Sequence, residues 1–171
     1  ALPVAGLHVD LVTAPDQLAV FANALGQDQI LSAGVVNGRN VWAAEADLIA
    51  ERIGAVARDL GDRLWIGTSC SLQRSPVDLE VEATLEPALR QRLAFAKQKL
   101  LELANVRQLL LAPESIAAKE IVQTCLARRE AKAQAADSQV IARVAALTSA
   151  DYERVSDFTV RQAVQQQKYR L

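Results

Sequence analysis

Several residue types are scarce in this sequence of 171 residues, and each scarcity excludes a class of protein. Two cysteines, Cys70 and Cys125, are too few for a disulfide-rich secreted scaffold. A single histidine, His8, excludes a metal site built on a pair of histidines. No apolar run approaches the roughly 18 residues of a membrane-spanning helix, and the first residues lack the charged and apolar regions of a signal peptide. These absences predict a soluble protein of the reducing cytoplasm.

An excess of charge is also missing, because 19 basic and 20 acidic side chains leave a net charge of -1. The chain therefore has no overall basic field for nucleic acid or for an anionic membrane. The charges are unevenly spread, with five basic and eleven acidic residues in 1–83 but fourteen and nine in 84–171. This split indicates either two solvated surfaces of opposite sign or a basic second part resting on an acidic surface, such as the first part. Methionine is absent even at position 1, so we expect the natural start to have been removed or to lie upstream.

Glycine is absent from the second part of the chain. All seven glycines lie at or before Gly67, and the rest is rich in alanine, leucine, glutamine and arginine. Glycine serves turns and close approaches, whereas a long glycine-free stretch of these residues favours helices. The composition therefore predicts a mixed first part and a helical second part.

Short apolar runs alternate with helical patterns in the first part. The runs are near-continuous rather than alternating, which predicts parallel strands in a sheet covered on both faces. Thr13 is expected to cap the first helix. The pattern predicts strands at 7–12, 30–36 and from 64, with helices at about 13–25 and 45–60.

Helical patterns dominate the second part, after an irregular stretch at 73–84. We expect Thr84 to cap one long helix that has Pro87 in its first turn. The fold class is therefore α/β, with a βαβαβ unit in 1–83 and a helical extension in 84–171. The helices are predicted at 84–111, 114–136 and 138–147.

Polar residues follow the second predicted strand. Asn37, Arg39 and Asn40 lie at the carboxyl end of that strand, where α/β folds place ligands. They are candidates for substrate binding, and in a stand-alone module they would hold an anionic group. The alternative is an ordinary turn at Asn37 and Gly38.

Cys70 follows the third strand in the same way and is a fourth candidate for substrate binding. The alternative is a structural role, because a free cysteine commonly packs as a small apolar side chain. His8 and Asp10 share one face of the first strand, either as a ligand-facing pair or as an internal hydrogen bond. Zinc would need three or four ligands brought together. We therefore assign no metal site and no catalytic residue, and Cys125 receives no role.

Several phrases of the sequence resemble one family, the cobalamin-independent methionine synthases. These are the 5-methyltetrahydropteroyltriglutamate–homocysteine methyltransferases, and the likeness covers nearly the whole chain. One departure is Gln73 and Arg74, where the family usually has a Leu-His pair. The phrases are LHVDL at 7–11, LSAGVVNGRNVW at 31–42, LWIGTSCSL at 64–72, SPVDL at 75–79 with Glu82, LAFA at 93–96, QKL at 98–100, ELA at 102–104 and ARR at 127–129.

The resemblance implies a fold of two (β/α)8 barrels. This chain would be the later part of the N-terminal barrel, with its last three strands, followed by the segment leading to the second barrel. The implied reaction moves a methyl group from 5-methyltetrahydropteroyltri-L-glutamate to L-homocysteine and makes methionine, with zinc activating the thiol.

The resemblance also implies that the C-terminal barrel binds the zinc, the homocysteine and the folate. The segment would be scaffold without the zinc site, and Cys70 looks like a relic of barrel duplication. Its partners would be the remainder of the parent chain, not nucleic acid or a membrane, and an isolated segment would self-associate. The alternatives are the stand-alone anion-binding module and a helical interaction protein that uses residues 84–171.

Overall fold

The computed structural model describes residues 3–153 and 157–169. The chain divides into two compact units, Ala1–Gln134 and Ala135–Leu171. The first unit holds a sheet and the helices that pack on it, and the second holds helices alone in its described part. The mixed first part and helical end predicted from composition are confirmed. The predicted domain division between residues 83 and 84 stays a prediction.

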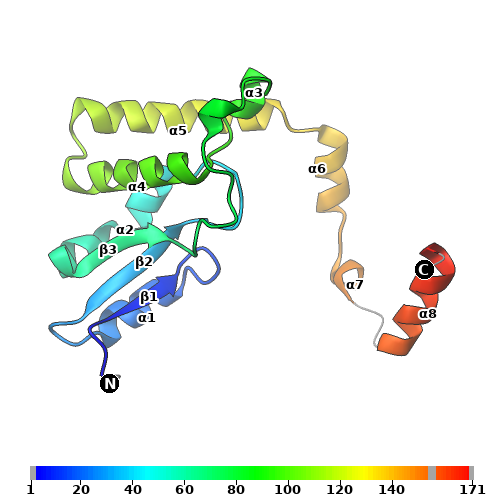
Figure 1. Ribbon diagram of the computed structural model, residues 1–171, viewed down its shortest axis with the longest axis horizontal. Helices are drawn as coiled ribbons and strands as arrows, with labels where there is room; N and C mark the ends of the chain where they lie inside the picture. Colours follow the sequence, from blue (N-terminus) through cyan, green and yellow to red (C-terminus); the bar gives the residue numbers. More distant parts are fainter. Residues whose placement is uncertain (1–2, 154–156, 170–171) are drawn as a thin grey trace. The chain divides into compact units, whose positions relative to one another are not determined.

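Three parallel strands form the sheet, in the order β1-β2-β3 (Figure 1). They are β1 (Gly6–Asp10), β2 (Ile30–Val36) and β3 (Leu64–Thr68), so the three predicted strands are confirmed. The first crossover contains α1 (Gln17–Ala24), and the second contains α2 (Ala46–Leu60), which ends at Gly61 with a φ of 55°. Glycine adopts this positive φ without the steric cost that other residues incur.

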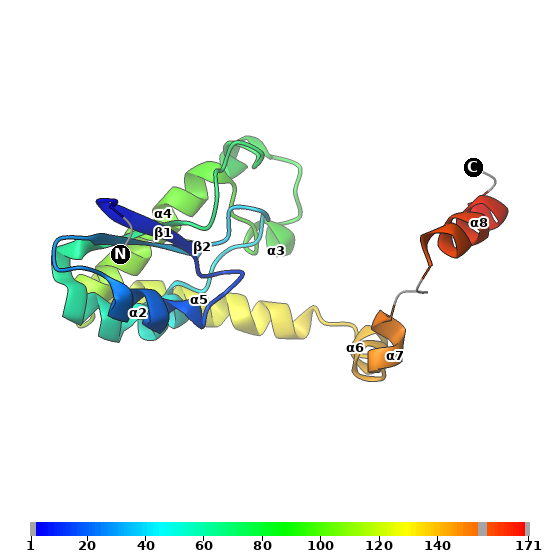
Figure 2. The same cartoon turned by 90° about the horizontal axis from the view of Figure 1, so that it is seen from below.

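Alternate side chains of the strands point into one hydrophobic core. Val9 of β1 and Leu31 and Ala33 of β2 are buried there, together with Ile53 of α2 and Val106 from a later helix. Figure 2 shows α2 and α5 (Ile116–Gln134) on the same side of the strands. Burial of these apolar side chains is the main force that holds the helices on the sheet.

The opposite face of the sheet is open, so the expectation of a sheet covered on both faces is wrong for the described residues. The register places His8, Ser32 and Trp65 side by side across the strands. His8 Nδ1 and Ser32 Oγ form a hydrogen bond of 2.9 Å, and Trp65 is 59% exposed. The strands therefore alternate between an apolar face and a face of polar, small and aromatic residues.

The single helix predicted over 84–111 is wrong, because the chain is broken there into α3 (Pro87–Arg90) and α4 (Ala96–Leu111). Residues between them pair with the segment after β2: the Ala43 amide donates to the Arg92 carbonyl at 2.9 Å, and the Ala94 amide donates to the Val41 carbonyl at 2.8 Å. These contacts hold the backbone extended, which is incompatible with a helix. The N-cap position of α3 is held by Glu86, without a side-chain hydrogen bond, and not by Thr84.

The second unit contains three helices in its described part: α6 (Ser138–Ala145), α7 (Ser149–Tyr152) and α8 (Phe158–Tyr169). Asp137 caps α6 by accepting from the Gln139 amide at 2.8 Å. A reciprocal pair of hydrogen bonds between Thr148 and Asp151 caps α7. In residues 3–153 and 157–169, no helix combines the length and the apolar character needed to cross a membrane.

Candidate functional site

Five residues gather at the carboxyl ends of the three strands, and we call this group the polar edge: Asp10, Thr13, Arg39, Ser69 and Cys70. An ion pair of 2.8 Å joins Arg39 to Asp10. The Thr13 hydroxyl donates to Asp10 Oδ2 at 2.8 Å, and the Thr13 amide donates to Oδ1 at 3.1 Å. Thr13 therefore bonds to Asp10 and does not cap α1, whose N-cap position is held by Asp16 without a side-chain hydrogen bond.

The hydrogen bonds at the polar edge keep Asp10 ionised. Partial burial would raise the pKa of its carboxyl, but the donors from Thr13 and Arg39 outweigh burial and lower the pKa to about 2. The same contact with Asp10 raises the pKa of the Arg39 guanidinium. Arg39 is 54% exposed in its side chain, yet its charge is already matched by Asp10. This pairing weakens the hypothesis that Arg39 holds an anion in a stand-alone module.

A close backbone approach joins the loops that follow β2 and β3. A Cβ added to Gly38 would lie 2.6 Å from the Cys70 carbonyl oxygen and 2.9 Å from its Sγ, so only glycine fits. The buried Ser69 accepts from the Gly38 amide at 3.2 Å and from Arg39 Nη1 at 3.5 Å. Sequence reasoning missed Ser69, whose signal was a hydroxyl residue directly after a strand.

Asn37 and Asn40 shape the loop after β2. The Asn37 side-chain oxygen accepts from the Arg39 amide at 2.8 Å, and that of Asn40 accepts from the Trp42 amide at 3.2 Å. Such bonds from an asparagine to the backbone two residues later stabilise a turn. The structure thus brings Arg39 and Cys70 to the polar edge, whereas the oxygens of both asparagines are bonded within the loop.

Two buried charged residues of α4 form hydrogen bonds to the backbone of the loop after β2. Lys99 Nζ donates to the Trp42 carbonyl at 3.1 Å, and Glu102 Oε1 accepts from the Ala44 amide at 2.8 Å. Burial lowers the pKa of the Lys99 ammonium and raises the pKa of the Glu102 carboxyl. Sequence reasoning missed both residues as parts of the site.

One cluster in the described residues has the composition of a metal site: Glu45, Asp47 and Cys125, whose ligand atoms lie within 4.8 Å of one another. The Arg129 guanidinium occupies it, with contacts of 2.7 Å to Glu45 and 2.6 Å to Asp47. Arg129 lowers the pKa of Asp47, and burial raises the pKa of the Cys125 thiol, which disfavours the thiolate that a metal needs. These residues do not fit zinc.

His8, Asp10 and Cys70 are not brought together as a ligand set in the described part of the chain. His8 is bonded to Ser32 on the open face, and Asp10 is bonded to Thr13 and Arg39. His8 and Asp10 are thus each hydrogen-bonded to other residues and not to one another, and the choice between a ligand-facing pair and an internal hydrogen bond stays a prediction.

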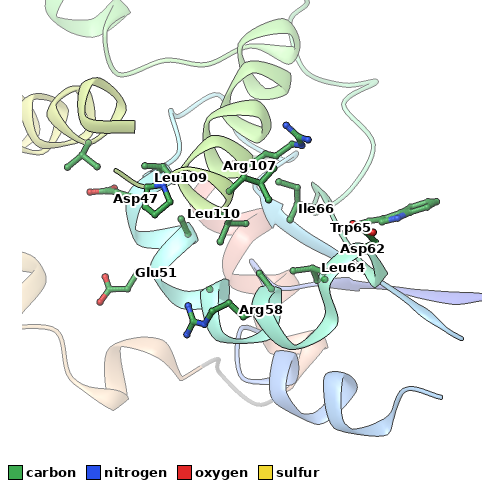
Figure 3. A pocket seen from close by; sticks show the side chains of 17 residues that line it. Asp47, Glu51, Arg58, Asp62, Leu64, Trp65, Ile66, Arg107, Leu109 and Leu110 are labelled. Carbon is green, nitrogen blue, oxygen red and sulfur yellow. The ribbon is translucent and has the colours of Figure 1, made fainter. Parts of the chain in front are cut away.

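A groove lies between α2, β3 and α4, away from the polar edge (Figure 3). Apolar side chains such as Leu64, Ile66 and Leu110 line it, with Glu51 and Arg58 among its charged residues. In Figure 3 the Trp65 side chain points away from Leu110. None of the residues singled out from the sequence as a binding candidate lines this groove.

Comparison with known proteins gives consistent matches. Residues 1–61 match the family described as "Cobalamin-independent synthase, N-terminal domain". The whole chain is 83% identical to a 5-methyltetrahydropteroyltriglutamate–homocysteine methyltransferase of Shewanella oneidensis, over 175 aligned positions. It is 44% identical to proteins of the same name from Burkholderia mallei and Burkholderia thailandensis.

Each of these three alignments covers 100% of this chain but 23% of the relative. The chain therefore spans less than a quarter of the length of the relatives that it matches. The resemblance predicted from the sequence phrases is confirmed by these identities. The chain is a segment homologous to the N-terminal region of the cobalamin-independent methionine synthases.

Proposed function

We propose that this chain is part of a methionine synthase that moves a methyl group from 5-methyltetrahydropteroyltri-L-glutamate to L-homocysteine. The observation that carries the proposal is 83% identity over the whole chain to a relative with that name. The reaction belongs to the longer protein, which we place in the cytoplasm. Folate and homocysteine are its proposed substrates, and the remainder of the longer chain is the proposed partner of this segment.

We infer that the sheet is three strands of a (β/α)8 barrel. Support comes from parallel strands in the order β1-β2-β3, with α2 and α5 on one face. A doubly wound fold would have helices on both faces, whereas a barrel has its helices outside and its other face inside. The open face with His8, Ser32 and Trp65 would then line the barrel interior.

Within the longer protein, this segment acts as scaffold and as part of the wall of the substrate cleft. Arg39 and Cys70 at the polar edge, with Asn37 and Asn40 in the loop, are the proposed wall residues. No catalytic role is assigned to them. The zinc of the longer protein is proposed to lie outside this chain, because the one metal-like cluster in the described residues already holds Arg129.

Methyl-transfer assays on two proteins test this proposal. The full-length gene product is expected to make methionine with methyltetrahydrofolate triglutamate, homocysteine and zinc, and to have about four times the mass of this chain, since the chain spans 23% of its relatives. The 171-residue chain alone should give background activity and hold well under one equivalent of zinc. A full-length product without methyl transfer would overturn the proposed activity, and turnover by the short chain would overturn the scaffold role.

A further inference from the structure

The loop between β2 and α2, residues 37–45, has its backbone held from both sides. The Val41 carbonyl and the Ala43 amide pair with the segment between α3 and α4. The Trp42 carbonyl and the Ala44 amide are bonded to Lys99 and Glu102 of α4. Four consecutive residues, 41–44, therefore each have a main-chain group in a hydrogen bond. Each partner lies about 50 positions or more away in the sequence.

The side chains that hold this loop are costly to bury. Lys99 is 0% exposed and Glu102 is 4% exposed. In the described part of the chain no ion pair within 4.0 Å joins them and Glu102 Oε2 has no hydrogen-bond partner, although the charges of Lys99 and Arg128 oppose the rise in the Glu102 pKa that burial causes. Apolar residues at such positions are often neutral or stabilising in comparison with buried charges. Stability alone is therefore a poor explanation for a lysine and a glutamate here.

The loop carries Arg39 two residues before the held segment, which begins at Val41, and Asn37 two residues before Arg39. Arg39 reaches Asp10, Thr13 and Ser69 only because the loop folds back over the strand ends. On the other side of the loop, Arg129 holds Glu45. Arg39 thus lies between the local bonds of Gly38 and Asn37 and the held segment that begins two residues later.

We propose that Lys99 and Glu102 are positioning residues, which fix the loop 37–45 so that Arg39 stays on Asp10 at the polar edge. The importance of this for methyl transfer rests on the proposed function, whereas the positioning itself does not. Because only Oε1 of Glu102 contacts the loop, one acceptor oxygen and not the charge is what this position supplies. Lys99 supplies a donor to the Trp42 carbonyl.

The pKa of Asp10 shows whether Arg39 stays in contact with its carboxylate. It can be measured by carbon NMR of labelled aspartates in the 171-residue chain. Arg39→Met gives the reference, because losing the guanidinium raises the Asp10 pKa from about 2 part of the way to 3.8. Lys99→Met and Glu102→Leu are expected to raise it in the same way. Lys99→Arg and Glu102→Gln keep the donor and the acceptor and should leave it near 2.

The Asp47 pKa is the internal control, because Arg129 lowers it at the contact between α2 and α5. An unchanged Asp10 pKa in Lys99→Met, with Asp47 still below its ordinary value, would overturn the proposal. If Lys99→Met fails to fold, the comparison of Glu102→Leu with Glu102→Gln decides, and equal Asp10 pKa values in that pair would overturn it. An Asp10 pKa that contradicts the positioning role would leave the methyl-transfer result unaffected. The two proposals can therefore be refuted separately.

Discussion

Arg129 of α5 donates two hydrogen bonds to Asp47 at the start of α2, with distances of 2.6 and 3.0 Å across 82 positions of sequence. It also contacts Glu45 at 2.7 Å. Lys97 forms a single contact with Asp78, at 2.7 Å and across 19 positions. These ion pairs join the basic part of the chain, 84–171, to the acidic part, 1–83. At these contacts they support the interpretation that the basic part packs on an acidic surface of the first part.

Replacing Arg129 should separate α5 from α2. In Arg129→Met, two carboxylates keep their charge but lose a bidentate partner, and like charges at short distance repel. We expect a lower urea midpoint for unfolding, followed by circular dichroism. The matched control is Lys132→Met, three residues later on the same helix, because Lys132 is exposed and forms no ion pair within 4.0 Å among the described residues. Equal midpoints for the two variants would refute a special role for Arg129.

Gly38 and Gly54 should respond in opposite directions to a methyl group. Gly38→Ala places a Cβ 2.6 Å from the Cys70 carbonyl, so the loops after β2 and β3 must move apart and stability must fall. Gly54 lies inside α2, where a Cβ meets only Arg58 at 3.6 Å. Gly54→Ala should therefore raise the free energy of unfolding by about 1 kcal/mol, as alanine favours helices. Urea titrations of both variants provide the check, and destabilisation by Gly54→Ala would contradict this account of its surroundings.

Acid should weaken the first unit through Asp10 and Asp78. Both carboxyls have a pKa lowered from 3.8 to about 2: for Asp10 the donors from Thr13 and Arg39 outweigh burial, and for Asp78 the main causes are Lys97 and Gln98. A lowered pKa in the folded state means that the stabilisation is present above the unfolded value and is lost as the pH falls through about 2. The free energy of unfolding should thus decline between about pH 4 and pH 2.

Asp10→Asn tests how much Asp10 contributes to the acid-induced decline in the free energy of unfolding. The variant starts less stable at pH 5 because it lacks the ion pair with Arg39, and it should lose less on acidification. Asp78 still titrates in this variant, so part of the decline persists. Parallel curves for the variant and the parent would show that Asp10 does not titrate as the geometry requires.

The 171-residue chain alone should self-associate. Within the described residues, β1 and β3 each pair on one side only, and the open sheet face exposes Trp65. Unpaired strand edges and exposed apolar surface both drive association. Sedimentation equilibrium at tens of micromolar should give masses above 18.5 kDa, and Trp65→Lys should lower them. A monodisperse monomer of 18.5 kDa would be evidence against this prediction.

Local sequence patterns predicted most of the elements because their causes are local. The run Ile30–Val36 is a strand with the predicted bounds, and α2 (Ala46–Leu60) agrees with the helix predicted at about 45–60. The break between α3 and α4 was not predictable in this way. It depends on the pairing of Leu93 with Trp42, and a window of sequence does not show which distant segment will lie alongside.

The open face and the buried charges were misjudged for different reasons. His8, Ser32 and Trp65 do carry the alternation of a one-sided sheet, but the apolar residues between them concealed it. Lys99 and Glu102 lie on the same helical stripe as the buried Val106 and Leu109, a spacing that placed them in the core. The loop groups that bond Lys99 and Glu102 Oε1 are more than 50 positions away, so a local pattern could not show these contacts.

Because each strand has one apolar and one polar face, the sheet also resists shifts in the register of its strand pairing. A shift of one residue in β1 would turn His8 toward the helices and expose Val9, since side chains alternate strictly along a strand. The same shift in β3 would bury Trp65 among α2 and α4 in place of Ile66. Each misaligned pairing therefore loses apolar burial and places a polar or oversized side chain in the core. The chain thus selects one register while it folds.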